Sequence, residues 1–180
     1  NAGTGTVTFK NRTAGTLINL GGSDVAGATG TRALGITDAE LDVITANALV
    51  IGQTGATASG DVTVSTNINP ALTKSLKILS GGNITLNANS VINTLANGNV
   101  VLNSDSDASG SGAIVMNTGS SISTNGGNIT LGGGSAGTGA DFAIGNATNP
   151  NGVLLNGASL SSAGGDITLR GKSSADASYY

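Results

Sequence analysis

One short motif recurs along this chain and constrains its fold more than any other feature. Gly-Gly-Asn-Ile-Thr-Leu occupies residues 81–86 and returns at 126–131, and Gly-Gly-Asp-Ile-Thr-Leu occupies residues 164–169. Looser copies lie at residues 5–9, 59–64 and 97–102. In the full copies, a turn of Gly and Asn or Asp precedes alternating apolar, Thr and apolar residues, which predicts a short strand with one buried face.

The spacing of the apolar centres predicts how these strands are arranged. Between the strong copies, apolar centres fall seven or eight residues apart, as at Ile84, Ile92 and Val100. Three such steps close a coil of roughly 20–24 residues, and about eight coils would stack in parallel at about 4.8 Å. The predicted fold is therefore all-β, a parallel β-helix or solenoid. A hairpin sandwich is the alternative, but hairpins would not return one hexapeptide in the same register.

Composition agrees with a thin core repeated along an axis. Of the 180 residues, 30 are Gly, only 2% are aromatic and 9% are charged, yet 38% are hydrophobic and the formal net charge is −3. Disorder usually accompanies low hydrophobicity and high net charge, so this chain is expected to fold. It must bury Ile, Val and Leu without the bulky residues of a thick core, which a solenoid achieves.

The residue types that are missing exclude several functions. The chain has no Cys and no His, which excludes disulfides, Cys or His zinc sites and a Ser-His-Asp triad. Its acidic balance provides no basic footprint for nucleic acid. No apolar run approaches the ~20 residues that span a bilayer. We expect no cofactor, no nucleic-acid partner and no membrane insertion.

Residues 34–52 contain a helical signal and the strongest family resemblance. Thr37 and Glu40 have the spacing of a capping box, which predicts a short helical turn near residues 37–44. The whole stretch, Leu-Gly-Ile-Thr-Asp-Ala-Glu-Leu-Asp-Val-Ile-Thr-Ala-Asn-Ala-Leu-Val-Ile-Gly, resembles one that is common in bacterial exoproteins of the filamentous-haemagglutinin-like family, which are exported by two-partner secretion. The Gly-Gly-Asn-Ile-Thr-Leu strands are similar to that family's shaft, and the resemblance extends over residues 16–170.

This resemblance implies a fold, a location and a role. Members of the family fold as right-handed parallel β-helices and act at the bacterial surface as adhesins, biofilm components or stalks. The family's amino-terminal secretion domain and effector domain have no counterpart in residues 1–180, so the resemblance implies a single shaft segment of a longer rod or fibre. We therefore expect a secreted, non-enzymatic protein for adhesion, display or biofilm assembly, with a glycan or protein receptor. A carbohydrate-active or glycan-binding β-helix is the alternative.

Two polar stretches interrupt the strand pattern, and loop insertions are expected near residues 103–112 and 132–151. In the first, Asp105 and Asp107 begin the order Asp-x-Asp-x-Ser-Gly, which matches the first half of a calcium loop. The twelfth position of such a loop, normally a bidentate Glu, is Met116 here, and a solvated loop is the alternative. No catalytic, cofactor-binding or metal-binding residue is therefore assigned from the sequence.

Strand alternation predicts the direction of each side chain in the motif. The side chains expected to point inward are Ile84, Leu86, Ile129, Leu131, Ile167 and Leu169. Those expected to point outward are Thr85, Thr130 and Thr168, an array that could also bind ice, although Thr is favoured in any strand. Asp61 and Asp166 hold the turn position that is Asn in other copies, and we expect them to belong to a ladder of turn residues.

The two ends are expected to be bare strand edges. Residues 5–9 are already strand-like, which leaves no room for a cap, and residues 172–180 form a short tail that ends in Tyr179 and Tyr180. Unpaired edges recruit other strands. We therefore expect the ends to meet further coils of the same parent chain, or copies of the chain stacked end to end.

Overall fold

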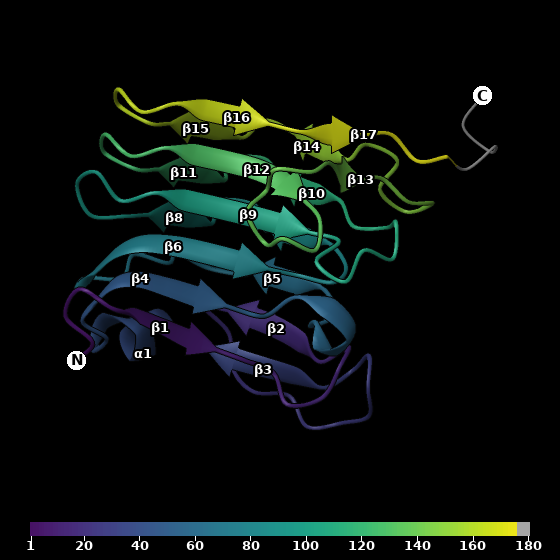
Figure 1. Ribbon diagram of the computed structural model, residues 1–180, viewed down its shortest axis with the longest axis horizontal. Coiled ribbons are helices and arrows are strands. Elements are labelled where there is room, and N and C mark those ends of the chain that lie inside the picture. The colour runs from purple at the N-terminus through teal and green to yellow at the C-terminus, as the bar shows by residue number, and fades with distance from the viewer. Residues whose placement is uncertain (176–180) are drawn as a thin grey trace.

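The computed structural model describes residues 1–175, which are mostly β-structure (Figure 1). Every pairing between the named strands is parallel. Within this range, helix is limited to α1 (Asp38–Asp42) and a 3-10 turn at Gly55–Thr57. The prediction of an all-β fold with parallel strands is therefore confirmed. Of the predicted tail at residues 172–180, Lys172 belongs to a short strand, and residues 176–180, with Tyr179 and Tyr180, lie outside the described residues.

Three parallel sheets make up most of the molecule. Sheet A has the order β1 (Thr6–Phe9), β4 (Ala46–Ile51), β6 (Thr73–Leu79), β9 (Val100–Ser104), β12 (Ile129–Gly133) and β16 (Ile167–Leu169). Sheet B has the order β3 (Ala33–Ile36), β2 (Leu17–Leu20), β5 (Val62–Val64), β7 (Ile84–Leu86), β10 (Ile114–Met116) and β14 (Val153–Leu155). Sheet C contains β8 (Val91–Asn93), β11 (Ser121–Ser123) and β15 (Ser159–Ser161), and a small fourth sheet pairs β13 (Ala143–Ile144) with β17 (Gly171–Lys172).

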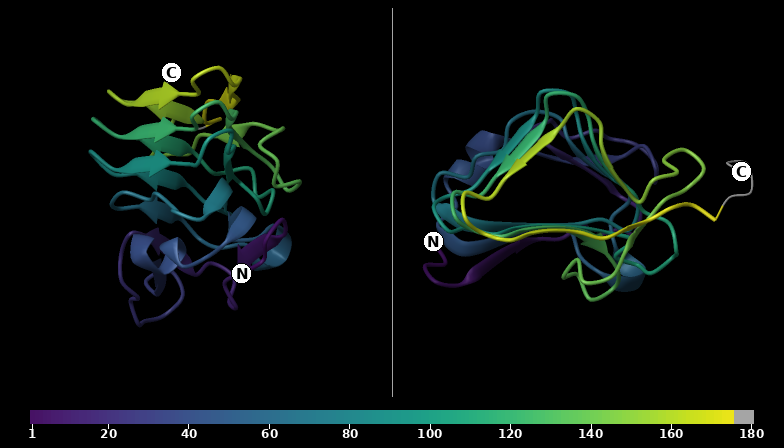
Figure 2. Two further views of the ribbon diagram at one scale, coloured as in Figure 1. Left: turned by 90° about the vertical axis from the view of Figure 1, so that its left-hand side faces the viewer. Right: turned by 90° about the horizontal axis from the view of Figure 1, so that it is seen from above.

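From β6 onward, the chain passes from sheet A to sheet B and sheet C and returns to sheet A one strand further along. We call one such passage a coil, and the three sheets form the sides of a triangle when viewed along the stack (Figure 2). The sequence predicts about eight coils, whereas sheets A and B each have six strands within residues 1–175. Insertions account for the smaller number, since the partners Leu76 and Val100 are 24 residues apart but Ile129 and Ile167 are 38 apart.

The core consists of columns of stacked apolar side chains. One column of sheet A contains Val7, Leu49, Leu76, Val100, Ile129 and Ile167. Side chains such as Ile84 and Ile129 are 0% exposed, and burying each stabilises the fold by about 1.5–3 kcal/mol. The inward direction predicted for Ile84, Leu86, Ile129 and Leu131 is therefore confirmed. Ile167 and Leu169 follow the same register but are 42% exposed, because they belong to the last strand of sheet A.

Polar side chains form ladders at the turns between coils. Asn99 Oδ1 accepts a hydrogen bond from the backbone N–H of Asn128 at 2.8 Å, and Asn128 Oδ1 accepts one from the N–H of Asp166 at 2.8 Å. The Asp61 carboxylate likewise accepts the N–H of Asn83 at 2.8 Å. The predicted ladder positions of Asp61 and Asp166 are therefore confirmed. Beside the first ladder, hydroxyls donate to turn carbonyls in the pairs Thr94 with Gly98, Thr124 with Gly127 and Ser162 with Gly165.

The N-terminal end of sheet B is covered, contrary to the expectation of a bare edge. Val25 forms an antiparallel bridge to Ala33 on the outer side of β3, and the Asp24 carboxylate accepts the N–H of Gly35 at 2.9 Å. The sequence argument found no room for a cap before the strand-like residues 5–9, but the covering segment lies between β2 and β3. Strand β1 of sheet A pairs only with β4 among the described residues.

The predicted helical turn is present as α1, with its capping box. Thr37 Oγ1 accepts the N–H of Glu40 at 3.4 Å, and the Glu40 carboxylate accepts the N–H of Thr37 at 2.8 Å. Leu41 is fully buried. The carboxylates of Asp38 and Asp42 accept the backbone N–H groups of residues 69 and 71 at 2.7 and 3.0 Å. These bonds attach α1 to the segment that precedes β6.

The capping box gives stability a defined pH dependence. The backbone N–H of Thr37, and then its hydroxyl, hold the pKa of Glu40 below its ordinary value. A carboxylate with a lowered pKa stabilises the fold above its unfolded pKa of about 4.3, and the contribution is lost as pH falls through the folded value. Glu40→Gln should therefore lower the urea midpoint at neutral pH, and the difference from the parent protein should vanish in acid. A difference that is constant down to pH 3 would contradict this role.

The two polar insertions begin later than the sequence predicts. Asn103 and Ser104 still belong to β9, and both side chains are 0% exposed. Strand β12 extends to Gly133, and the second insertion contains β13 rather than loop alone. Asn103 and Ser104 can continue β9 because their buried side chains form hydrogen bonds to the insertions, to Gly134 and Gly139 and to Gly112, in place of apolar contacts.

Candidate functional site: the uncovered C-terminal end

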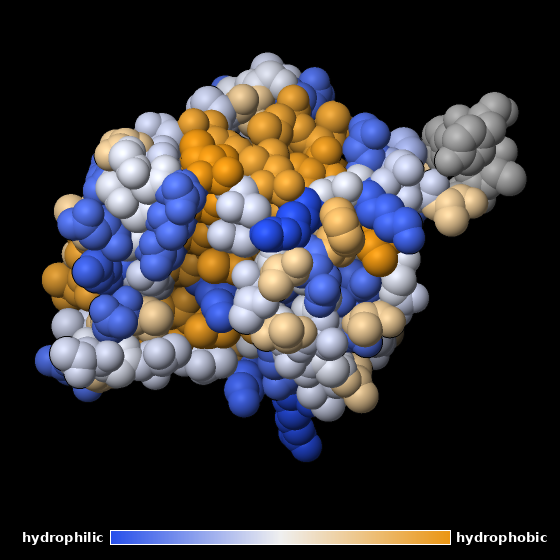
Figure 3. Space-filling model, turned by 45° about the horizontal axis from the view of Figure 1, so that its top comes forward, coloured by the Kyte–Doolittle hydropathy of each residue, from blue (hydrophilic) through white to orange (hydrophobic). Residues whose placement is uncertain are grey.

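Apolar side chains that are buried in the coil below are half-buried or exposed on the last coil. We call this surface the C-terminal end face and define it by Val153, Leu155, Leu160, Ile167 and Leu169. Leu155 is 38% exposed and Ile167 and Leu169 are 42% exposed. Their partners one coil below, Met116, Ile129 and Leu131, are 0% exposed. Figure 3 shows the resulting continuous apolar area at this end of the molecule.

The same coil has strand edges without neighbours. Strands β14, β15 and β16 are each the last in their sheets, and each is paired on one side only within residues 1–175. Their outer N–H and C=O groups are therefore available to a further strand. Monomeric proteins normally block such edges or keep them short and charged, whereas these three lie around an apolar surface.

The turn ladder also ends at this face. Asp166 donates its N–H to Asn128 below, and its own carboxylate accepts no hydrogen bond from the described part of the chain. Ser162 Oγ, 2.5 Å from the carbonyl oxygen of Gly165, holds the turn that carries Asp166. The end face thus combines an apolar floor, free backbone groups and one free acceptor at a defined position.

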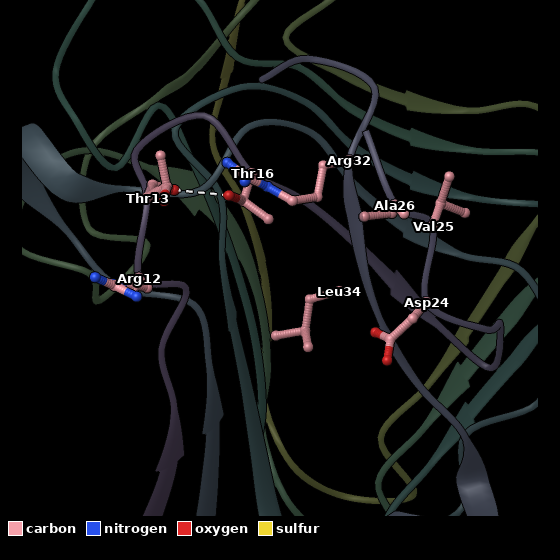
Figure 4. Close-up of a pocket in the computed structure, with 9 residues that line it drawn as sticks. Arg12, Thr13, Thr16, Asp24, Val25, Ala26, Arg32 and Leu34 are labelled. Carbon is pink, nitrogen blue, oxygen red and sulfur yellow. Dashed lines mark hydrogen bonds between the residues drawn. The ribbon is translucent and has the colours of Figure 1, made fainter. Parts of the chain in front are cut away.

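A pocket of about 530 Å³ lies at the opposite end, beside the segment that covers β3 (Figure 4). Arg12 and Arg32 come from two different segments of its wall, and Leu34 and Val25 add apolar surface. Thr13 and Thr16 also line the pocket, and Thr16 Oγ1 donates a hydrogen bond to the Thr13 carbonyl at 2.8 Å. Within residues 1–175, neither guanidinium forms an ion pair. The two guanidinium groups could hold a small anionic group, although the Asp24 carboxylate lines the same pocket.

Asp105 and Asp107 are used by the first insertion itself. Asp105 is only 4% exposed, and its Oδ1 accepts hydrogen bonds from Ser109 Oγ at 3.2 Å and from the N–H groups of Gly110 and Ser111 at 2.9 and 3.3 Å. Asp107 Oδ1 accepts the N–H of Ser109 at 3.1 Å. No group of three acidic side chains that could hold a metal occurs among the described residues. Through these hydrogen bonds, both carboxylates hold the conformation of the loop at residues 105–111.

The second insertion folds back over the outer face of sheet A. Asn103 holds it there, because its Oδ1 accepts the N–H of Gly139 at 2.8 Å and its Nδ2 donates to the carbonyl of Gly134 at 2.9 Å. Gly139 has a φ of +68°, and a Cβ at that position would lie 2.8 Å from Thr130 Cγ2. Sequence reasoning missed Asn103, whose only signal was a polar residue directly after an apolar strand.

The second insertion lies over Thr130, one of the outward Thr residues. Thr8, Thr130 and Thr168 occupy equivalent positions in sheet A, but Thr63 and Thr85 lie in sheet B. Val50, Lys77 and Val101 separate the Thr residues of sheet A. The Thr side chains therefore form no single flat array of the kind that ice binding requires.

Removing the Asn103 side chain should release the insertion. Asn103→Ala leaves the buried N–H of Gly139 without its partner, at a cost of about 1–3 kcal/mol, whereas the Gly134 carbonyl keeps the hydrogen bond from the N–H of Gly137. We expect a lower urea midpoint and faster proteolysis within residues 134–142. Asn47→Ala is the matched control, since Asn47 is exposed and should leave both measurements unchanged. Equal protease resistance in the two variants would show that the contact does not hold the loop.

A scan against protein-family models and searches of curated proteins and of solved structures found no match to this chain. The membership implied by residues 34–52 therefore stays a prediction. No helix among the described residues has the length and apolar character needed to cross a membrane.

Proposed function

We propose that the chain is a segment of a right-handed parallel β-helix that serves as a structural shaft. The observation that carries this proposal is the set of apolar columns that continue in register through six strands of sheet A. Crossover connections between parallel strands are almost always right-handed, which supports the handedness. Each coil adds about 4.8 Å to the rod, so such a chain sets a length and presents its loops along a line.

The shaft acts outside the cell, at the surface of a bacterium, in adhesion, display or biofilm assembly. The support is the resemblance of residues 34–52 to the filamentous-haemagglutinin-like family. Its partners are further coils of the parent chain and a glycan or protein receptor. The protein is not an enzyme in this proposal, since its acidic side chains organise loops and ladders.

Immunogold labelling of intact producing cells tests the location, and negative-stain images of the released protein test the shape. We expect label outside the cell and thin rods. Deleting one complete coil should shorten the rods by about 5 Å and lower adherence only where the receptor site is removed. Label confined to the cell interior, or globular particles of the parent protein, would overturn the proposal.

A glycan-binding β-helix is the second candidate, and the unpaired Arg12 and Arg32 in the 530 Å³ pocket favour it. These cations suit an acidic sugar, because guanidinium groups bind carboxylates and sulfates in bidentate geometry. Binding to an array of acidic oligosaccharides that is lost in Arg12→Ala/Arg32→Ala, and retained in the control Lys10→Ala, would support it. Cleavage of any polysaccharide by the chain would instead show that the protein is an enzyme and would overturn the shaft proposal.

A further inference from the structure

We propose that the turn formed by Asn156 and Gly157 is a site of covalent modification, at which the side-chain amide of Asn156 is hydrolysed through a cyclic imide. Asn followed by Gly is well suited to this reaction, because Gly has no side chain to obstruct the attack. Such pairs occur at residues 97–98, 125–126, 151–152 and 156–157, all within the described part of the chain. The folded structure leaves the last pair free to react and restrains the other three. This inference goes beyond the proposed shaft function and does not rest on it.

The reaction joins atoms of two neighbouring residues. The backbone nitrogen of Gly157 loses its proton and forms a bond to Cγ of Asn156, and the bond from Cγ to Nδ2 breaks, which releases ammonia. Water then opens the resulting succinimide at one of its two carbonyl groups and leaves either Asp or isoaspartate at this position. Nothing is oxidised or reduced, since one water is consumed and one ammonia is released. The attack needs a backbone N–H without a hydrogen bond and a side chain that can turn toward it.

Asn156 and Gly157 meet both requirements. They lie in the turn between β14 of sheet B and β15 of sheet C, at a corner of the triangle (Figure 2), and both residues are exposed. Within residues 1–175, neither the N–H of Gly157 nor the side chain of Asn156 forms a hydrogen bond. The three atoms nearest to the Cβ position of Gly157 all belong to Thr118, at 3.4 Å or more. The Asn156 side chain therefore has room to rotate onto the backbone nitrogen.

The free N–H is a property of this turn and not of its place in the last coil. The Gly157 carbonyl accepts the N–H of Gly119 at 2.9 Å, and one coil below the Thr118 carbonyl accepts the N–H of Asn89 at 3.1 Å. Gly157 and Thr118 therefore occupy equivalent positions. Within residues 1–175, the N–H of Thr118 also has no hydrogen bond, although another coil lies over it. Stacking alone does not occupy the attacking group.

The two pairs that precede β9 and β12 are restrained by hydrogen bonds that the reaction would have to break. The N–H of Gly98 donates to the carbonyl three residues before it at 2.9 Å, and the N–H of Gly126 donates to the Ser162 carbonyl at 2.6 Å. The Nδ2 of Asn125, which would have to leave, also donates to a carbonyl of the coil below at 3.0 Å. Each attacking nitrogen is therefore available only after a local opening of its turn.

The pair of Asn151 and Gly152 is restrained by packing. Gly152 is buried, and its carbonyl accepts the N–H of Ile114 at 2.8 Å. A Cβ at Gly152 would collide with the Ala143 carbonyl oxygen and with the backbone nitrogen of Lys172, so main chain lies close to it in two directions. The peptide group between Asn151 and Gly152 therefore has no room to turn toward the Asn151 side chain.

Peptide mapping of the full chain tests the inference within one sample. The folded protein is incubated at mildly alkaline pH, digested at acidic pH and analysed by mass spectrometry, which distinguishes the four pairs. We expect Asp and isoaspartate to form at Asn156 about tenfold faster or more than at Asn97, Asn125 or Asn151, because those sites must first open. In the chain unfolded in urea, the four rates should become similar, which would assign the difference to the fold.

Variants connect the product to the proposed chemistry. Asn156→Gln should remove the acidic species that appears on anion exchange, since each event adds one negative charge. Gly157→Ala should slow its formation by about tenfold, because a Cβ obstructs the approach of the two atoms. The φ of Gly157 is +66°, and Ala163 shows that the chain accepts Ala in this conformation, with a φ of +51°. Asn97→Gln is the matched control and should leave the rate at Asn156 unchanged.

Two results would overturn the inference. One is a rate at Asn156 in the folded chain that is no greater than the rates at the three restrained pairs. The other is an unchanged rate at Asn156 in folded Gly157→Ala, which would show a route that does not use the Gly157 nitrogen. The first comparison is made in the parent chain, so it decides the question whether or not a variant folds. Neither result bears on the test of the shaft function.

Discussion

Replacing Ile129 with Asp is expected to lower the free energy of unfolding by about 4 kcal/mol or more, because it buries an unpaired charge. Ile129 is 0% exposed and lies between Val100 and Ile167 in the column of sheet A. Urea denaturation followed by far-UV circular dichroism measures the loss. Acidification should recover part of it, since burial raises the pKa of the new carboxyl and the neutral form costs less to bury.

Two other substitutions separate charge burial from a general intolerance of change. Ile129→Val should cost about 0.5–1.5 kcal/mol, the usual result of removing one buried methylene group. Thr85→Asp places the same charge at an outward, half-buried position of β7 and should cost far less than the change at Ile129. Equal destabilisation by Ile129→Asp and Thr85→Asp would show that the assigned strand register is wrong.

The C-terminal end face should make the isolated chain associate, and Ile167→Lys/Leu169→Lys should abolish that association. Both side chains are 42% exposed and adjoin unpaired strand edges, a combination that promotes contact between molecules. Sedimentation velocity over a wide concentration range is the measurement. We expect weak, concentration-dependent oligomers from the parent chain, in which the β16 amides still exchange as edge amides, and monomers from the double variant, with little change in the urea midpoint.

Thr168→Lys is the matched control, since it adds the same charge to the same strand at an outward position. It should associate as the parent chain does. A parent chain that remains monomeric throughout, with slowly exchanging β16 amides, would mean that the end is covered by the chain itself.

The repeated motif was enough to predict the strands, their parallel pairing and the inward columns, because strand alternation and turn residues are local properties. Asp61 and Asp166 could be placed in ladders for the same reason, since each substitutes for Asn at an identical turn. The capping box of Thr37 and Glu40 was equally local. The C-terminal edge followed from the motif, but its exposed apolar floor needed the structure, because periodicity does not show which coil is last.

The features that were missed depend on contacts between distant segments. Asn103 holds Gly139, which is 36 residues away, and no local pattern distinguishes such an Asn from one in a solvated loop. The bridge from Val25 to Ala33 uses a segment with no strand alternation at all. Asp105 was considered as a calcium ligand because the spacing of oxygen atoms is visible in sequence, whereas the loop N–H groups that occupy its carboxylate are not.

The parallel stacking has a mechanical consequence for a molecule anchored at one end. Hydrogen bonds between coils lie along the stacking direction, so tension between the two ends of the chain opens them one coil at a time rather than shearing a whole sheet. The coil that begins at Leu76 contains 24 residues before its partner Val100. Released, it would extend from about 4.8 Å to about 80 Å. A tether built this way lengthens in small steps under load, and each step absorbs work that would otherwise reach its attachment.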